Sequence, residues 1–412
     1  MKEKPVKTNK LANDKTKTIL ALGAESAGNF CVYNKGEFYH SPDFGDLLDG
    51  ANFENFQKEV FAHLKKNKLK PNIILTDLHP DFKTTLWGKE LAKKYKAEFI
   101  QIQHHLAHIF SAVGEHLGTN WDALLPSDDF IGIACDGTGY GFDENIWGGE
   151  VFSFSKTKSK IINNKLQITN KCQSSNFKIQ RIGHLENQTL IGGDLTIREP
   201  ARMLISILNK FLPKDKIYNF VKKYYSKQEF EVLYNQLQQN FNCQETSSAG
   251  RILDAVSLLL GFCGNERKYK HEAINLLEKN SIGTEAYRDI EPIIEHTIAS
   301  RKLPNREEYI EGNYTLSTTT LFEYLIKSLS EGKDKKRLAV TAQLYIAKGL
   351  YEIIAKSSID NSQPPIIFAG GGLTNNKIIL EYFESKGVII NKKKLRGDAG
   401  ISFGQICYYL LN

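Results

Sequence analysis

Two histidines at helical spacing are the residues of this chain best suited to hold a metal ion. His104 and His108 lie four residues apart, and the apolar residues that follow them predict a helix. At that spacing both imidazoles project from one helical face and could bind a single divalent metal. The residue after His104 is not the Glu of a metalloprotease H-E-x-x-H motif, so a protease lacks its general base. A structural or exposed histidine pair is the simpler alternative.

Two aspartates could supply oxygen ligands to the same ion. Asp136 follows an apolar strand predicted over residues 130–135, and ligands gather at the carboxyl ends of strands in open α/β sheets. Asp398 precedes small residues and a short C-terminal helix. We therefore predict that both carboxylates meet the histidine pair, whereas a capping Asp in a glycine-rich hairpin and a plain Asp-Ala-Gly turn are the alternatives.

Glycine-rich segments in the second half of the chain are typical of anion sites. Glycine lets backbone N–H groups approach an anion without an intervening side chain, and a helix N-terminus favours negative charge. Ser247 is the predicted N-cap of a helix that contains residues 252–260. Two arginines beside the second segment could grip a phosphate or form surface charge. The segments are Asp136–Gly141, Ile191–Asp194, Ser247–Arg251 and Gly370–Gly372.

Strands alternate with helices along the chain, which predicts an α/β fold. The chain has 412 residues, 41% of them hydrophobic. A chain of this length is too long for one simple hydrophobic core, which indicates two lobes. We expect a first lobe over residues 18–127, completed by a C-terminal helix over 399–412, and a second lobe over 128–398. The predicted strands cover 18–24, 29–33, 72–77, 97–103, 130–135 and 365–369, and the predicted helical regions cover 53–66, 87–95, 201–237 and 338–355.

Composition limits the classes of partner. No apolar run approaches the ~20 residues of a membrane span, and residues 1–17 are polar and lysine-rich, unlike a signal peptide. We interpret residues 1–17 as a disordered basic tail, and a solubilising end is a simpler explanation for it than a nucleic-acid-binding arm. The net charge of +7 does not require a polyanionic partner. The six cysteines lack C-x-x-C spacing, which disfavours a zinc knuckle or a disulfide framework and fits a reducing cytoplasm.

From about Ile19 to the C-terminus the chain resembles the carbamoyltransferase module of the HypF family of [NiFe]-hydrogenase maturation proteins. The resemblance implies a two-lobed actin-like/Hsp70-like ATPase (ASKHA) fold with nucleotide and metal in the cleft between the lobes. It rests on eight motifs in the same order: Asp77–Pro80, Gln103–His108, Asp136–Gly141, Trp147–Glu150, Gly192–Asp194, Ser247–Arg251, Gly370–Gly372 and Asp398–Gly400.

The resemblance also implies residue roles. Iron, zinc or magnesium would be bound by His104, His108, Asp136 and Asp398, of which His104, His108 and Asp136 would be catalytic. The implied contacts to ATP, AMP or carbamoyl-adenylate are Gly137, Thr138, Gly139, Gly141, Gly192, Gly193, Asp194, Ser248, Gly250, Arg251, Gly370, Gly371, Gly372 and Asn375. In the family, carbamoyl-adenylate donates its carbamoyl group to the C-terminal cysteine thiol of a partner, HypE.

The chain also departs from the family pattern. Full-length members carry acylphosphatase, zinc-finger and YrdC-like domains before this module, so we expect this chain to perform the second half-reaction with a donor made by a separate YrdC-like protein. Lys270–Glu272 replaces a more usual Glu-Gly-Gln/Glu sequence, which puts one nucleotide contact in doubt. Two alternatives remain: an O-carbamoyltransferase acting on a small-molecule hydroxyl, and a non-catalytic nucleotide-binding scaffold.

Overall fold

The computed structural model describes residues 17–118, 129–156, 177–296, 300–301, 309–310, 314–357, 364–393 and 396–412. The chain divides into two compact units. Unit 1 comprises residues 1–128, 155–178 and 391–412, and unit 2 comprises residues 129–154 and 179–390. Apart from Lys17, the basic tail predicted over residues 1–17 lies outside the described residues.

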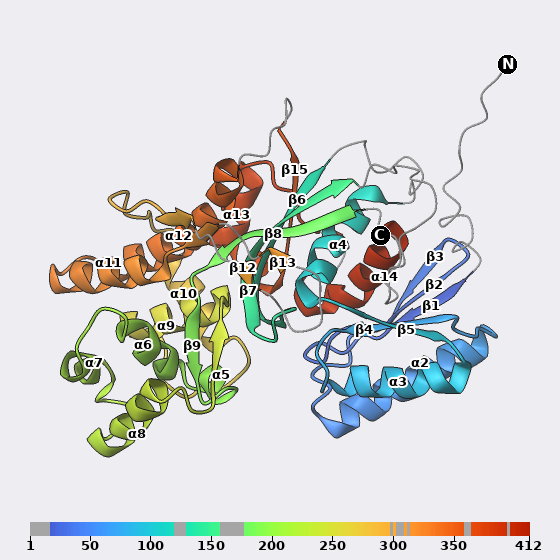
Figure 1. The fold of residues 1–412 in the computed structure, drawn as a ribbon, viewed down its shortest axis with the longest axis horizontal. Coiled ribbons are helices and arrows are strands. Elements are labelled where there is room, and N and C mark those ends of the chain that lie inside the picture. Colours follow the sequence, from blue (N-terminus) through green and yellow to red (C-terminus); the bar gives the residue numbers. More distant parts are fainter. Residues whose placement is uncertain are drawn as a thin grey trace. The chain divides into compact units, whose positions relative to one another are not determined.

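Unit 1 is built on a five-stranded sheet in the order β3-β2-β1-β4-β5 (Figure 1). β1, β4 and β5 are parallel, whereas β2 pairs antiparallel with both β1 and β3. The strands are β1 (Thr18–Ala21), β2 (Cys31–Asn34), β3 (Glu37–His40), β4 (Ile73–Asp77) and β5 (Glu98–Ile102), and the helices are α2 (Gly50–Lys66), α3 (Lys83–Tyr95), α4 (His104–Leu117) and α14 (Ile401–Leu411).

Alternation along the strands assigns the two faces of this sheet. Successive residues of a strand point to opposite faces of the sheet. On one face, Leu20 of β1 and Ile74 of β4 belong to a hydrophobic core with Phe56 of α2 and Trp87 of α3. The other face is covered by α14, which lies against β1, β2 and β4 and packs along α4. The central strands β1 and β4 are therefore buried on both faces, as all of their residues show.

The crossing of α4 and α14 depends on glycine. A Cβ atom at Gly404 would lie 1.8 Å from the carbonyl oxygen of Ala107, and one at Gly114 would lie 2.3 Å from the Sγ of Cys407. At Gly404 the obstructing atom belongs to the backbone, so only a residue without a side chain fits there, whereas at Gly114 the Cys407 side chain would have to move. At Gly404 the two helices consequently approach backbone to backbone.

Unit 2 contains an eight-stranded sheet in which β6 joins β7 to β15. β6 pairs antiparallel with β7 and parallel with β15. The strands are β6 (Phe130–Tyr140), β7 (Ile146–Lys156), β8 (Phe177–Leu185), β9 (Gln188–Ile191), β10 (Cys243–Thr246), β11 (Ile294–His296), β14 (Tyr314–Leu316) and β15 (Ile366–Gly370), and β12 (Ser300–Arg301) pairs separately with β13 (Tyr309–Ile310).

Helices of unit 2 enclose one large hydrophobic core with this sheet. They are α5 (Leu195–Arg198), α6 (Pro200–Leu208), α7 (Lys214–Val221), α8 (Lys227–Gln238), α9 (Ala249–Leu260), α10 (Glu272–Ser281), α11 (Thr318–Ser330), α12 (Lys335–Lys356) and α13 (Lys377–Ser385). By length and composition, α12 could cross a membrane, but 67% of its apolar stretch is buried inside the protein, as in a core helix.

The helical region predicted over residues 201–237 is three helices rather than one. Pro213 precedes α7 and Ser226 caps α8, where its side chain and that of Glu229 form a capping box. Pro213 and Ser226 therefore interrupt the helical region, which forms the three separate helices α6, α7 and α8.

Candidate metal centre and anion site

The histidine pair lies at the start of α4. β5 ends at Ile102, and the side chain of Gln103 accepts a hydrogen bond from the Leu106 N–H at 2.9 Å, which caps the first turn of the helix. His104 and His108 are therefore one turn apart on the same face, as predicted, and each is 2% exposed.

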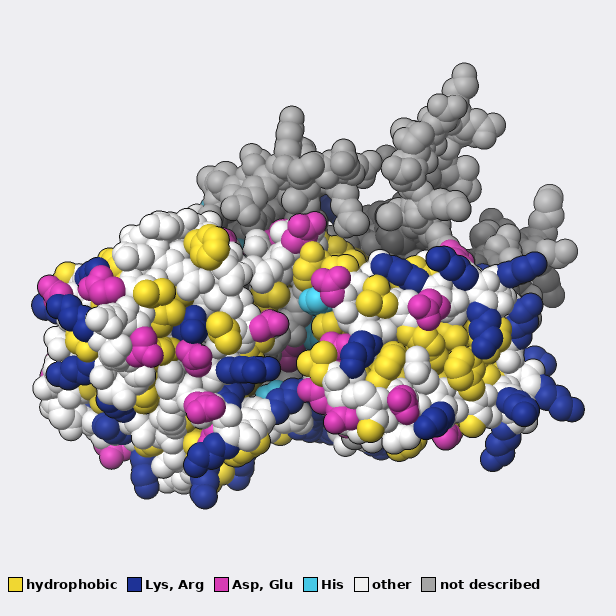
Figure 2. Space-filling view, turned by 90° about the horizontal axis from the view of Figure 1, so that it is seen from below, with side chains coloured by type: hydrophobic (Ala, Val, Ile, Leu, Met, Phe, Trp, Pro, Cys, Tyr) yellow, Lys and Arg dark blue, Asp and Glu magenta, His cyan; other side chains and the backbone are white. Residues whose placement is uncertain are grey.

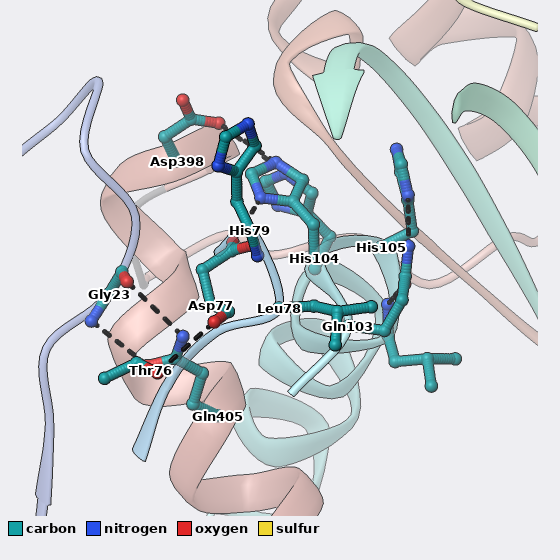
Figure 3. A network of polar contacts seen from close by, with 12 residues as sticks. Gly23, Thr76, Asp77, Leu78, His79, Gln103, His104, His105, Asp398 and Gln405 are labelled. Carbon is teal, nitrogen blue, oxygen red and sulfur yellow. Dashed lines mark hydrogen bonds and ion pairs between the residues drawn. The ribbon is translucent and has the colours of Figure 1, made fainter. Parts of the chain in front are cut away.

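Three donor atoms of unit 1 converge at this face. His104 Nε2 lies 3.2 Å from His108 Nε2. Asp398 Oδ1 lies 3.7 Å from His104 Nε2 and 3.6 Å from His108 Nε2. Figure 3 shows Asp398 directed toward the His104 ring.

These spacings fit a divalent ion. Two ligands each ~2.1 Å from a metal are about 3.0 Å apart at an octahedral right angle and about 3.4 Å apart in a tetrahedron. The two histidine nitrogens, 3.2 Å apart, fall within this range, and only the distances of 3.6 and 3.7 Å to Asp398 exceed it, so a small adjustment of Asp398 would seat an ion. Two imidazoles and one carboxylate form a donor set used for zinc and for non-haem iron.

Asp398 is placed by the segment that leads into α14. It lies in the short helix η2 (Gly397–Gly400). The side chain of Asn29 donates to the Ala399 carbonyl at 2.5 Å and accepts from the Ser402 hydroxyl at 2.6 Å. The loop after β1 therefore holds both sides of the turn that carries Asp398.

Asp77 contacts His104 at Nδ1, the ring nitrogen opposite the one that faces the converging donor atoms. Its Oδ2 lies 2.7 Å from His104 Nδ1, and its Oδ1 accepts from the backbone N–H of His79 at 3.0 Å. Burial by itself would raise the pKa of this carboxyl, but His104 and the His79 N–H hold the pKa below its usual value. The sequence motif Asp77–Pro80 by itself predicts no role for Asp77, although Asp77 lies at the end of a buried strand, the same pattern that indicates Asp136 as a ligand.

In unit 2, Asp136 lies within β6 rather than after it. The strand continues to Tyr140, with a register shift against β7 between Cys135 and Gly139. The predicted glycine-rich turn is thus a bulged strand, and the turn itself follows from Gly141, whose N–H bonds to the Asn145 carbonyl. Pairing with β7, which local sequence does not reveal, extends the strand through the glycines.

The glycines after β15 lie against this bulge. Gly372 N–H donates to Asp136 Oδ1 at 2.7 Å. Gly371 has φ 108°, and a Cβ there would lie 2.3 Å from the Cys135 carbonyl oxygen, so only glycine fits. Gly370 ends β15 opposite Ala134, and Asn375 ends the short helix η1 (Gly372–Asn375).

The N-terminus of α9 also meets the bulge. Ser248, not Ser247, is its N-cap: the Ser248 hydroxyl accepts from the Arg251 N–H at 3.0 Å and donates to the Gly137 carbonyl. The predicted cap was wrong by one residue because Ser247 bonds Glu150 instead. A Cβ at Gly250 would lie 2.7 Å from Gly137 Cα, so glycine permits this close approach.

Beside this N-terminus lies a buried cluster with excess positive charge. Arg251 and Arg267 both bind the same carboxylate oxygen of Asp254, and the three side chains are 2–9% exposed. Burial lowers the pKa of Arg251 to about 10. Among the described residues, Nε and Nη1 of Arg251 have no hydrogen-bond partner. Unsatisfied buried cationic donors favour a bound anion.

The Gly192–Asp194 segment lies apart from this group. Gln188 of β9 is paired with Thr246, whereas Ile191 is paired with Cys243. Gly192 therefore follows the end of β9 that is farther from Ser248, about 10 Å along the strand. Gly192 and Gly193 have φ 82° and 56° and form the turn into α5.

Two family models match most of the chain. The description "HypF Kae1-like domain" covers residues 14–115, and "Carbamoyltransferase, Kae1-like Domain, second subdomain" covers residues 132–167 and 172–405. The chain belongs to the HypF carbamoyltransferase family. The resemblance identified from the sequence motifs is thus confirmed.

Curated HypF relatives cover nearly the whole chain. A probable carbamoyltransferase HypF of Methanocaldococcus jannaschii is 35% identical over 99% of this chain and 48% of the relative. A carbamoyltransferase HypF homolog of Cupriavidus necator is 26% identical over 94% of this chain and 90% of that relative. The chain thus spans about half the length of the first of these relatives and most of the second.

Solved HypF structures share the fold. HypF of T. kodakarensis superposes with a TM-score of 0.76 at 28% identity, over 96% of this chain and 48% of that chain. A full-length HypF in its phosphate- and nucleotide-bound form gives the same TM-score at 24% identity, over 96% and 55%. The α/β fold of the actin-like ATPase class predicted from the sequence is confirmed.

Burial disfavours the thiolate form of two cysteines of this HypF-family chain, Cys135 and Cys263. Burial raises the pKa of the Cys135 thiol far above its usual range, with the adjacent Asp136 adding to the effect, and raises that of Cys263 to about 11.

On the face shown in Figure 2, basic and acidic side chains are interspersed over each unit.

Proposed function

We propose that this chain is a carbamoyltransferase that passes a carbamoyl group from carbamoyl-adenylate to the C-terminal cysteine thiol of a HypE-type partner. The reaction would serve cyanide-ligand synthesis in [NiFe]-hydrogenase maturation. One observation carries the proposal: in a chain of the HypF family, His104 Nε2, His108 Nε2 and Asp398 Oδ1 lie 3.2–3.7 Å from one another. That donor set provides the chemistry that activation of a phosphate-linked acyl donor needs.

The metal ligands we assign are His104, His108 and Asp398 together with Asp136. The first three are supported by their spacing in unit 1, and Asp136 by its place in the family motif and by its carboxylate chemistry. A bound iron, zinc or magnesium ion would act as a Lewis acid toward the donor's carbonyl or phosphate oxygen. The chain's own task is to present these donors in a fixed, water-poor position.

The bulge of β6 and the elements against it form the proposed anion site. Gly137, Gly371 and Gly372 add no side chains of their own at the bulge, and the N-terminus of α9, capped by Ser248, adds oriented N–H groups. Arg251 contributes buried positive charge. We assign the phosphate of the donor to this group, together with Thr138, Gly139, Gly141, Gly250, Gly370 and Asn375 around it. The contribution of Gly192, Gly193 and Asp194 to nucleotide binding stays a prediction.

The proposed transfer balances without an oxidant or reductant. The acceptor sulfur attacks the carbamoyl carbon, a C–S bond forms, and the C–O bond to the phosphate breaks. AMP leaves and the thiol proton passes to solvent, which gives a thiocarbamate on the acceptor. Because the described cysteines of this chain are buried or have raised pKa values, we place the acceptor thiol on another protein.

The family match assigns these residues to the Kae1-like domain, so the step we assign to them is the transfer. The donor would come from a YrdC-like adenylating activity. We place the reaction in the cytoplasm, which suits five described free cysteines, and we propose no role for a membrane or nucleic acid.

Labelled carbamoyl transfer tests the proposal. Purified protein is given carbamoyl-adenylate and a HypE-type acceptor, alongside an acceptor whose C-terminal cysteine is replaced by alanine. We expect label on the intact acceptor only, with loss of transfer in His104→Ala and Asp136→Ala. His116→Gln, on the exposed end of α4, is the matched control. Transfer to a small alcohol instead, nucleotide binding without transfer, or full activity in both variants would each contradict the proposal.

A further inference from the structure

We infer that Asp77 is a positioning residue for the proposed metal centre, which fixes the tautomer of His104 so that its Nε2 atom presents a lone pair to an ion. The inference rests on the proposed metal site and adds a residue to which no role has yet been given. Asp77 is the last residue of β4 and His104 is the first residue of α4, with α3 and β5 between them in the chain.

The carboxylate of Asp77 is held rigidly. The residue is 0% exposed, and Figure 3 shows it between the His79 backbone and the His104 ring. Oδ1 accepts from the His79 N–H at 3.0 Å, and Oδ2 lies 2.7 Å from His104 Nδ1. The Thr85 hydroxyl donates to the Asp77 carbonyl oxygen at 3.2 Å. Both oxygens are thus engaged, and rotation of the carboxylate would break two hydrogen bonds in a site closed to water.

This contact determines which nitrogen of His104 carries a proton. An ionised carboxylate only accepts hydrogen bonds, so Nδ1 of His104 must be the donor. A neutral imidazole protonated at Nδ1 has its lone pair on Nε2, and Nε2 is the atom that lies 3.2 Å from His108 Nε2. A tautomer protonated at Nε2 could not bind a metal through that atom.

The same contact aims the ring. His104 is held at one nitrogen by a fixed acceptor while the other points to His108 and Asp398. Without Asp77, the ring would have to adopt the binding orientation and tautomer when the ion arrives, at a cost in affinity. Carboxylate partners of metal-binding histidines typically change affinity by about 10–100-fold when removed.

Metal titration of Asp77→Asn tests this role with zinc or cobalt alone, in the absence of any carbamoyl donor or acceptor. Asp81→Asn removes the same charge from an exposed position four residues away and is the matched control. We expect a metal dissociation constant about 10–100-fold higher for Asp77→Asn, a changed cobalt absorption spectrum, and values equal to wild type for Asp81→Asn. Equal affinity and spectrum for Asp77→Asn with only a lower melting temperature would show a purely structural ion pair and overturn the inference.

A second measurement needs no Asp77 variant. Long-range nitrogen–proton correlation spectra of histidine-labelled wild-type protein report the tautomer of each imidazole, and His104→Gln identifies the signals of His104. We expect protonation at Nδ1 before metal is added, and Nε2-protonated His104 would refute the inference. Neither experiment measures carbamoyl transfer. Both would therefore still test the role of Asp77 if the proposed transferase activity were not found.

Discussion

Replacement of Gly404 by alanine should separate α14 from α4, the helix that carries two ligands of the proposed metal centre. The new methyl group would lie 1.8 Å from the carbonyl oxygen of Ala107, and the helices must move apart by roughly 1.6 Å to restore van der Waals distance. Since the obstructing atom belongs to the backbone of α4, no side-chain rotation relieves the clash. We therefore expect the free energy of unfolding to fall by about 3 kcal/mol, the upper part of the range for overpacking.

That loss corresponds to a melting temperature lower by about 6 to 12 °C for a unit of this size. Asp398 precedes α14 by three residues, so displacement of the helix should also weaken zinc binding, by about tenfold or more. Differential scanning calorimetry and chelator competition measure the two effects.

Gly50→Ala is the matched control for this substitution. Gly50 is the first residue of α2, and a Cβ there would meet no atom within 4 Å. The same added methyl should therefore leave stability unchanged or raise it by up to about 1 kcal/mol, through helix propensity. If Gly404→Ala melts within about 2 °C of wild type and binds zinc equally well, the close helix crossing does not constrain the site.

Three further predictions concern separate parts of the chain. His108→Gln should abolish stoichiometric zinc binding in equilibrium dialysis because it removes one converging nitrogen, whereas His116→Gln on the same helix should bind like wild type. Arg251→Ala should weaken adenine-nucleotide binding by about 10–100-fold in calorimetric titration, the usual effect of a charged hydrogen bond, and the exposed Arg288→Ala should not. Glu186 accepts from the Thr318 and Thr319 N–H groups. Burial alone would raise its pKa, but hydrogen bonds from Lys210 and Thr319 hold the pKa below its usual value. Its stabilisation is therefore present above the unfolded pKa and lost as pH falls through the folded one. Glu186→Gln should accordingly lower the melting temperature at about pH 7 and have a smaller effect near about pH 3; an equal effect at both would contradict the assigned charge.

The secondary structure of buried apolar segments was predictable from the sequence. The strand expected over 72–77 is β4 (Ile73–Asp77), and the helix expected over 338–355 lies within α12 (Lys335–Lys356). The i, i+4 spacing of the histidines likewise gave a shared helical face, because local geometry determines it.

Features that depend on distant partners were not predictable. Gly137 and Gly139 suggested a turn, but the pairing of β6 with β7 extends the strand through them. Ser247 has as good a capping side chain as Ser248, and only Glu150, far away in sequence, distinguishes them. The role of Asp77 requires the ring of His104 beside it, which no pattern within one segment reveals.

Because Asp398 and α14 are translated long after His104 and His108, a nascent chain on the ribosome exposes the histidine pair well before its third partner exists. During that interval α4 and the sheet face later covered by α14 have no covering helix. An ion that binds all three donors can therefore be taken up only after Asp398 has left the exit tunnel, so assembly of the proposed metal site is a late step in the biogenesis of this chain.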